Sequence, residues 1–161
     1  MFFQVLTKII QGMVLVSGST MTALVIIEVF LRYLFGKSLY VTEELSRYLM
    51  VWVVFLGSSL ALREEAHIRI GLLVNKFGGR VRLCLHLFAH LLLLLFLVVL
   101  VIQGIVVLPF QKYQTAPSIG VSFFWFYLAI PVGGILMILY LMPPLGQSLK
   151  EMFSKGDNKP H

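Results

Sequence analysis

The stretch LLLLLFLVVLVI, residues 91–102, decides the fold class of this chain. It lies inside a longer apolar segment, 83–108, which can span a bilayer because a spanning helix needs about 20 mostly apolar residues. Backbone groups cannot stay unpaired in lipid, and the alternating pattern of barrel strands does not occur here, so a helix is expected. Similar segments predict three further spans, at about 9–32, 43–62 and 121–142. The sequence therefore predicts an all-α integral membrane protein, a single domain of four transmembrane helices over residues 1–161.

The composition agrees with lipid as the surrounding solvent. Of the 161 residues 59% are hydrophobic and only 12% are charged, whereas soluble domains carry about 25% charged residues. The net charge of +6 comes from basic residues in short segments between the apolar runs, which membrane topology and anionic lipid explain. Membrane lipid is therefore an expected partner and nucleic acid is not. The single cysteine, Cys84, can form neither an internal disulfide nor a CxxC pair.

The distribution of Lys and Arg predicts the orientation. Nine of them lie in the N-terminal segment, between the second and third spans and in the tail, against four on the opposite side. The positive-inside rule then places both termini in the cytoplasm. Residues 67–77 mix apolar and basic side chains, so a short amphipathic helix on the cytoplasmic surface or a loop that inserts into the interface is expected there. The polar tail, 147–161, is expected to fray.

Charged residues gather near the predicted outer ends of the first two spans. Glu28 precedes Arg32 by four residues, and Glu43 and Glu44 stand one turn before Arg47 at the entrance of the second span. An ionised group in hydrocarbon costs about 2.5–3.5 kcal/mol, so it normally finds a partner. We therefore predict a helix–helix charge cluster of Glu28, Arg32 and Arg47, in which Glu28 approaches Arg47 across the two helices. A purely structural pairing, an interface to a partner membrane protein and an ion pathway remain alternatives, and the nearby arginines argue against the pathway.

Two histidines in the third span, His86 and His90, are spaced i,i+4. Such spacing can bind a metal ion or present an axial haem ligand. No carboxylate or thiolate pair accompanies them apart from the single Cys84. Helix packing is the favoured reading, and no cofactor or metal is expected.

Small residues predict where the helices approach each other closely. They cluster at 17–20, at 57–59 and at the pair Gly133-Gly134. Pro131, just before that pair, is expected to kink the fourth helix.

Several of these features follow one another in an order that resembles a known family. EVFLRY at 28–33 is followed by EELSRYLMVWVVFLG at 43–57, then by Arg63 and by the pair His67-Ile68. Together with the chain length, the four spans and the PVGG element at 131–134, this pattern resembles the small membrane subunit of tripartite ATP-independent periplasmic (TRAP) transporters.

The resemblance implies a three-part system in the bacterial inner membrane. A periplasmic binding protein captures an organic acid anion, such as sialic acid or a C4-dicarboxylate, and a large multi-span subunit carries it across with a sodium gradient. The small subunit is implied to be no enzyme, to pack against the large subunit and anchor it, and to contact the binding protein only transiently. The positions that match the family pattern are Arg32, Glu43, Glu44, Arg47, Trp52, Gly57 and His67.

The roles expected at these positions differ. Glu28, Arg32 and Arg47 are expected to pair helices, and Glu43, Glu44 and Trp52 to contact a partner or the outer surface. Two other classes of protein are alternatives. A haem-binding electron-transfer anchor would use His86 or His90, and a small four-helix multidrug exporter would use Glu28 as an unpaired carboxylate.

Overall fold

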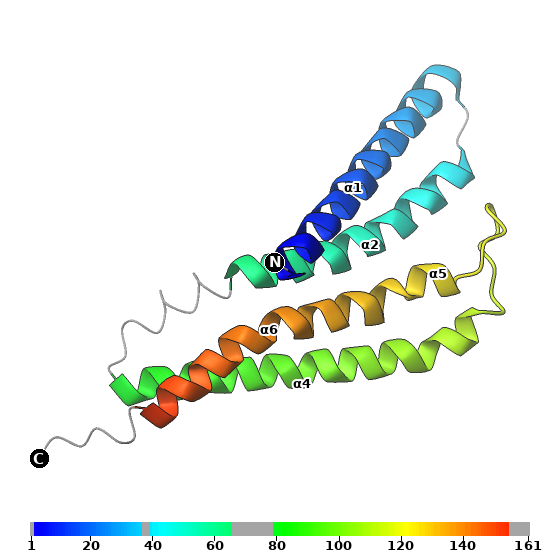
Figure 1. Cartoon of the computed structure of the whole chain (residues 1–161). Helices are drawn as coiled ribbons and strands as arrows, with labels where there is room; N and C mark the ends of the chain where they lie inside the picture. The colour runs from blue at the N-terminus through cyan, green and yellow to red at the C-terminus, as the bar shows by residue number, and fades with distance from the viewer. Residues whose placement is uncertain (1, 37–38, 66–78, 155–161) are drawn as a thin grey trace, which may run out of the picture.

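The computed structural model describes residues 2–36, 39–65 and 79–154, and most of them lie in long helices (Figure 1). Four helices in this part of the chain are long and apolar enough to cross a membrane. The predicted all-helical membrane protein with four spans is therefore confirmed. The helices are α1 (Phe2–Phe35), α2 (Tyr40–Glu65), α4 (Gly79–Gln111), the short α5 (Phe124–Tyr127) and α6 (Ala129–Ser154).

The first three long helices extend beyond the predicted spans. The span predicted at 9–32 begins in the structure at Phe2, and the one predicted at 83–108 ends at Gln111. A hydropathy pattern marks the part of a helix that suits lipid, whereas the helix itself continues as long as its residues keep forming backbone bonds. The helices are therefore longer than the predicted spans at both ends, and the bounds of the parts that lie in lipid stay a prediction.

The fourth span has a local irregularity at Leu128, although the backbone of Leu128 stays helical (φ −59°, ψ −25°) and its N–H donates to the carbonyl of Phe124 at 3.0 Å. α5 ends at Tyr127 and α6 begins at Ala129, with Leu128 between them. Pro131 has no N–H to donate to the carbonyl of Tyr127, and a proline ring crowds the carbonyl four residues before it. The irregularity predicted at Pro131 therefore lies one turn upstream of the proline, at the start of α6.

The C-terminal part of the fourth span corrects another expectation. The tail was predicted to fray from residue 147, but α6 continues to Ser154. Residues 147–154 include Leu149, Lys150 and Met152, which are good helix formers. The Ser148 hydroxyl also donates to the carbonyl of Pro144 at 3.0 Å. The predicted interfacial segment at 67–77 and the end of the tail lie outside the described residues.

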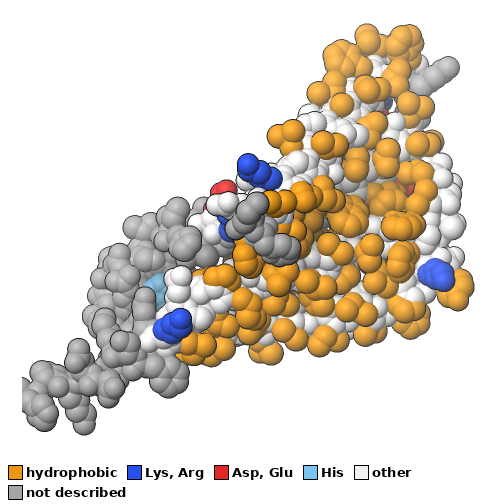
Figure 2. Space-filling view, in the orientation of Figure 1, with side chains coloured by type: hydrophobic (Ala, Val, Ile, Leu, Met, Phe, Trp, Pro, Cys, Tyr) orange, Lys and Arg blue, Asp and Glu red, His pale blue; other side chains and the backbone are white. Residues whose placement is uncertain are grey.

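The helices are arranged as a fan rather than as a closed bundle (Figure 1). α1 packs on α2, α2 packs on α6, and α6 packs on α4, so α2 and α6 lie in the middle and α1 and α4 are at the edges. Figure 2 shows hydrophobic side chains over most of the visible face. In the most apolar window of each span, 6% of the residues are buried in α1 and 11% in α4, against 33% in the span that contains α6. The edge helices therefore leave most of their apolar surface uncovered.

Two adjacent glycines allow α6 to pack closely against both α2 and α4. A Cβ atom on Gly133 would lie 2.7 Å from the Cβ of Phe55 in α2, and one on Gly134 would lie 2.6 Å from a methyl carbon of Val101 in α4. The close approach predicted at this pair is confirmed. Gly18 and Gly57 differ, because a Cβ there would meet nothing within 4 Å. The small residues of α1 and α2 therefore do not mark comparable contacts at these glycines.

The connection between α4 and α5 forms a compact hairpin. Thr115 and Ser122 pair as an isolated antiparallel bridge. The Ala116 N–H donates to the carbonyl of Val121, and the Gly120 N–H donates to the carbonyl of Ala116, both at 2.8 Å. Gly120 has φ +71°, a left-handed conformation that glycine adopts without steric cost. This hairpin brings the start of the fourth span close to the entrance of α2.

Candidate functional site

The charged residues near the α1–α2 turn form two ion pairs, each within one helix. Glu28 pairs with Arg32 on α1, and Glu43 pairs with Arg47 on α2 at 2.9 Å. The Glu28 side chain is only 9% exposed, whereas the Arg47 side chain is 69% exposed. The first pair therefore has a buried carboxylate and the second lies on the surface.

The predicted contact between Glu28 and Arg47 is not formed. Among the described residues, no ion pair joins α1 to α2. Side chains four residues apart on one helix are neighbours by geometry, so each arginine finds its carboxylate without crossing to the other helix. The paired carboxylate at Glu28 also differs from the unpaired one that a multidrug exporter of this kind would need.

Glu44 makes the long-range polar contact at the entrance of α2. One carboxylate oxygen accepts a hydrogen bond from the Tyr48 hydroxyl at 2.7 Å, and the other accepts one from the Ser118 N–H at 2.9 Å. Ser118 belongs to the hairpin before α5 and is 74 residues away in sequence. Glu44 therefore fastens that hairpin to the start of α2, and the partner or outer-surface contact expected for it stays a prediction.

Aromatic side chains reinforce this junction. The Tyr48 ring stacks on Phe126 of α5 with the centroids 3.7 Å apart, and its edge meets Phe123 at 5.8 Å. Tyr48 itself is buried. Hydropathy did not predict this stack, because the aromatic residues near 123–127 fit an interfacial belt equally well.

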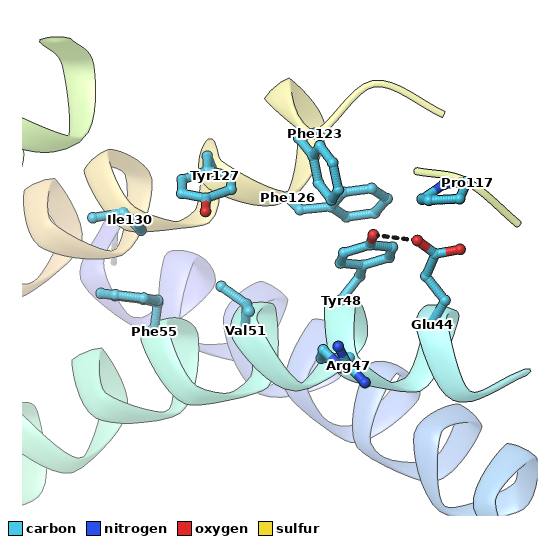
Figure 3. A pocket seen from close by; sticks show the side chains of 10 residues that line it. All are labelled: Glu44, Arg47, Tyr48, Val51, Phe55, Pro117, Phe123, Phe126, Tyr127 and Ile130. Atoms are coloured by element: carbon cyan, nitrogen blue, oxygen red, sulfur yellow. Dashed lines mark hydrogen bonds between the residues drawn. The ribbon is translucent and has the colours of Figure 1, made fainter. Parts of the chain in front are cut away.

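A cavity lies beside the junction, between α2 and the α5–α6 segment (Figure 3). Its volume is about 640 Å³, and it is open to the surface of the chain rather than enclosed. The charged groups on its lining are Glu44 and Arg47. The other lining residues are Tyr48, Val51, Phe55, Pro117, Phe123, Phe126, Tyr127 and Ile130.

A second junction joins α1, α2 and α6 at the opposite end of the helices. Tyr140 of α6 shares a hydrogen bond of 2.9 Å with the Thr7 hydroxyl of α1. The Arg63 guanidinium of α2 lies 6.0 Å from the centre of the Tyr140 ring, within the range of a cation–π contact. Tyr140 also packs with Ile10 and Leu56 in the buried core cluster. Sequence spacing does not predict this junction, because Thr7 and Tyr140 are 133 residues apart along the chain.

The remaining predicted positions have simpler surroundings. Trp52 is partly buried and packs against the core cluster around Leu56 and Tyr140, so its ring makes an internal contact. His90 is buried, and its Nδ1 lies 2.8 Å from the carbonyl of His86 on the same helix. Within residues 2–36, 39–65 and 79–154, no group of three or more His, Cys, Asp or Glu could hold a metal ion. His67 lies outside the described residues.

Comparison with known proteins identifies the class. Residues 21–150 match the family model of the tripartite ATP-independent periplasmic transporters, DctQ component. That match covers most of the chain, and it includes α2, α4, α5, most of α6 and the C-terminal part of α1. The chain is therefore a multi-pass membrane protein that belongs to the DctQ family, the small permease subunits of TRAP transporters.

Individual relatives agree with this assignment. A Haemophilus influenzae protein named as a TRAP transporter small permease is 30% identical over 139 residues, which are 86% of each chain. The sialic acid TRAP transporter small permease protein SiaQ of Vibrio cholerae is 28% identical over 66% of this chain and 62% of its own. The sialic acid TRAP transporter permease protein SiaT of Haemophilus influenzae is 30% identical over 71% of this chain, but over only 19% of its own length.

Proposed function

We propose that this chain is the scaffold subunit of a sodium-driven, binding-protein-dependent TRAP transporter for organic acid anions such as sialic acid or C4-dicarboxylates. It packs against a large multi-span subunit and anchors it in the bacterial inner membrane, with both of its own termini in the cytoplasm. It carries out no chemistry and holds neither the solute nor the ion. The periplasmic binding protein contacts the assembly transiently from outside.

The relative SiaT supports the proposed partnership. Its matching segment is about a fifth of a much longer permease chain, so a segment like this one occurs covalently joined to further permease sequence. Segments that are fused in one protein and separate in another are commonly parts of one assembly. The remainder of such a permease is therefore the natural counterpart of the large subunit proposed here.

The main support for the proposal is the exposed apolar surface of the two edge helices, α1 and α4. Large apolar side chains remain exposed along α1 and α4, among them Ile26 at 50% and Leu95 at 62%. Lipid alone can cover such surfaces, but a helix that packs on one neighbour also offers a long face to a second one. A fan with open edges suits a subunit that extends a larger protein, and it suits a self-contained carrier poorly.

The polar contacts fit a static role. Transport sites in membranes use interrupted helices and polar groups near the bilayer midplane. Here Glu28 is paired, Glu44 fastens a hairpin, and Thr7 and Tyr140 bond to each other across helices. Glu28 is therefore neutralised within α1, and the other two contacts join separate elements, so these polar groups bond inside the fold and are not left free for a solute.

Co-purification tests the proposal. The chain carries an affinity tag and is extracted from its host membranes in a mild detergent. We expect a multi-span TRAP subunit, identified by mass spectrometry, to elute with it in a fixed ratio. A tagged chain that elutes alone, from membranes that demonstrably contain the large subunit, would contradict the scaffold role.

A further inference from the structure

The cavity between α2 and the α5–α6 segment has the shape and chemistry of a lipid site. Phe55 is the lining residue of α2 farthest from Glu44, and it is also the residue that packs closely against Gly133 of α6. The outer end of the cavity lies at the Glu44–Tyr48 junction with the hairpin. Between Phe55 and this outer end the lining residues Val51, Tyr127 and Ile130 are mainly apolar (Figure 3).

The length of the cavity corresponds to one leaflet. Glu44 at the outer end and Phe55 at the inner end are eleven residues apart on α2, which is about 16 Å at 1.5 Å per residue. Half of a hydrocarbon core of about 30 Å is about 15 Å. An acyl chain that enters beside Arg47 would therefore end near the close contact of Gly133 with Phe55.

The charges at the rim select the headgroup. Arg47 and Glu43 form an exposed pair, and Glu44 is already bonded to Tyr48 and Ser118. Glu43 does not line the cavity, but its ion pair with Arg47 keeps it beside the opening, so Glu43, Glu44 and Arg47 together carry a formal charge of −1 there. An anionic headgroup would add a second negative charge, whereas a zwitterion offers a phosphate to Arg47 and an ammonium to Glu43 and adds no net charge.

We propose that this cavity binds one acyl chain of a zwitterionic, amine-bearing glycerophospholipid, whose phosphate lies on Arg47 and whose ammonium lies on Glu43. Lipid is the solvent around these helices, so an open apolar cavity at this depth is in contact with acyl chains at very high concentration. The inference rests on the location in the membrane and not on the transport role. A failed co-purification and a failed lipid experiment would therefore be distinguishable.

Native mass spectrometry of the full-length chain tests the lipid site. The chain is released from nanodiscs that contain equal amounts of phosphatidylethanolamine and phosphatidylglycerol. We expect one phosphatidylethanolamine molecule to be retained in preference to phosphatidylglycerol. Equal retention of the two lipids, or retention of neither, would overturn the proposal.

A variant that fills the cavity shows where the retained lipid binds. Ile130→Trp places an indole in the lining, and the matched control Ile135→Trp lies on the exposed surface of the same helix. An indole displaces several methylenes of the acyl chain, so retention should fall about tenfold in Ile130→Trp and stay unchanged in the control. Equal retention in both variants would place the lipid elsewhere and overturn the proposal.

Two further variants protect the test against misfolding and examine the headgroup. If Ile130→Trp loses its helical circular dichroism, Val51→Phe fills the same cavity with a smaller change and should also reduce lipid retention.

Arg47→Gln removes the phosphate contact and should lower lipid retention about fivefold. The control Lys112→Gln removes an exposed cation outside the cavity and should leave retention unchanged. A cavity variant that folds and still retains the lipid in full, or an equal response of Arg47→Gln and Lys112→Gln, would contradict the proposed site.

Discussion

α1 and the span that contains α6 have the same mean hydropathy, 2.0 in their most apolar windows, but very different positions in the fold. In those windows 6% of the residues are buried in α1 and 33% in the α6 span. The difference arises at a few small and polar residues, above all at Gly133 and Gly134, where α6 touches α2 and α4. Hydropathy therefore indicates that both helices lie in a membrane, and local packing decides which one is central.

The largest loss of stability should follow from a substitution that prevents the close packing of α6 against α2. Gly133→Leu forces a side chain against Phe55, where even a Cβ would lie at 2.7 Å, so the free energy of unfolding should fall by about 3 kcal/mol. The measurement is reversible unfolding of the chain in mixed micelles. Gly18→Leu on α1 is the matched control, because a Cβ there meets nothing within 4 Å. This variant should leave the free energy of unfolding unchanged. Equal losses at the two glycines would remove the distinction between the central and the edge helix.

The charge pair of α1 should give the next largest effect. Arg32→Gln leaves the buried Glu28 carboxylate without its cation, so stability should fall by about 1–2 kcal/mol. Arg47→Gln is the control on α2, where both partners are exposed, and it should cost about 0.5 kcal/mol or less. The double variant Glu28→Gln with Arg32→Gln should recover most of the loss. A larger cost for Arg47→Gln than for Arg32→Gln would contradict the pairing described here.

The direct hydrogen bond between α1 and α6 should give the smallest effect. Thr7→Val removes the hydroxyl that contacts Tyr140, and hydrogen bonds between helices in membranes contribute about 0.6 kcal/mol on average. Thr22→Val is the control, since that hydroxyl bonds only to the backbone of its own helix at Gly18. The same unfolding assay should distinguish the two. A Thr7→Val variant as stable as Thr22→Val would show that the hydrogen bond from Thr7 to Tyr140 does not stabilise the packing of α1.

The fold class could be predicted from the sequence because each membrane span is a run of consecutive apolar residues. The apolar run at 91–102 needs no partner to be recognised as a membrane helix. The closeness of α6 to its neighbours was also predictable at Gly133-Gly134, since adjacent small residues leave room for two helices. The ends of the helices were not, because α6 continues to Ser154 through Pro143, Pro144 and Gly146, which disfavour helix and would predict an earlier end.

The contacts of the site depend on distant parts of the chain, and sequence spacing predicted only part of them. The pairs Glu28–Arg32 and Glu43–Arg47 follow from i,i+4 geometry. The bond from Ser118 to Glu44 does not, because 74 residues and two helices separate the partners. The expected cross-helix contact was wrong for the same reason, since spacing along one helix says little about which residues face the next.

The central claim is that this chain supports a transporter without moving the solute itself. The most direct measurement is uptake of radiolabelled sialic acid into liposomes under a sodium gradient, with a sialic acid-binding periplasmic protein outside. Liposomes that contain this chain alone should take up no more solute than empty ones, and adding the large subunit of the same system should be required for any accumulation of a solute that the system carries. Accumulation by the chain alone, above that of empty liposomes, would contradict the account.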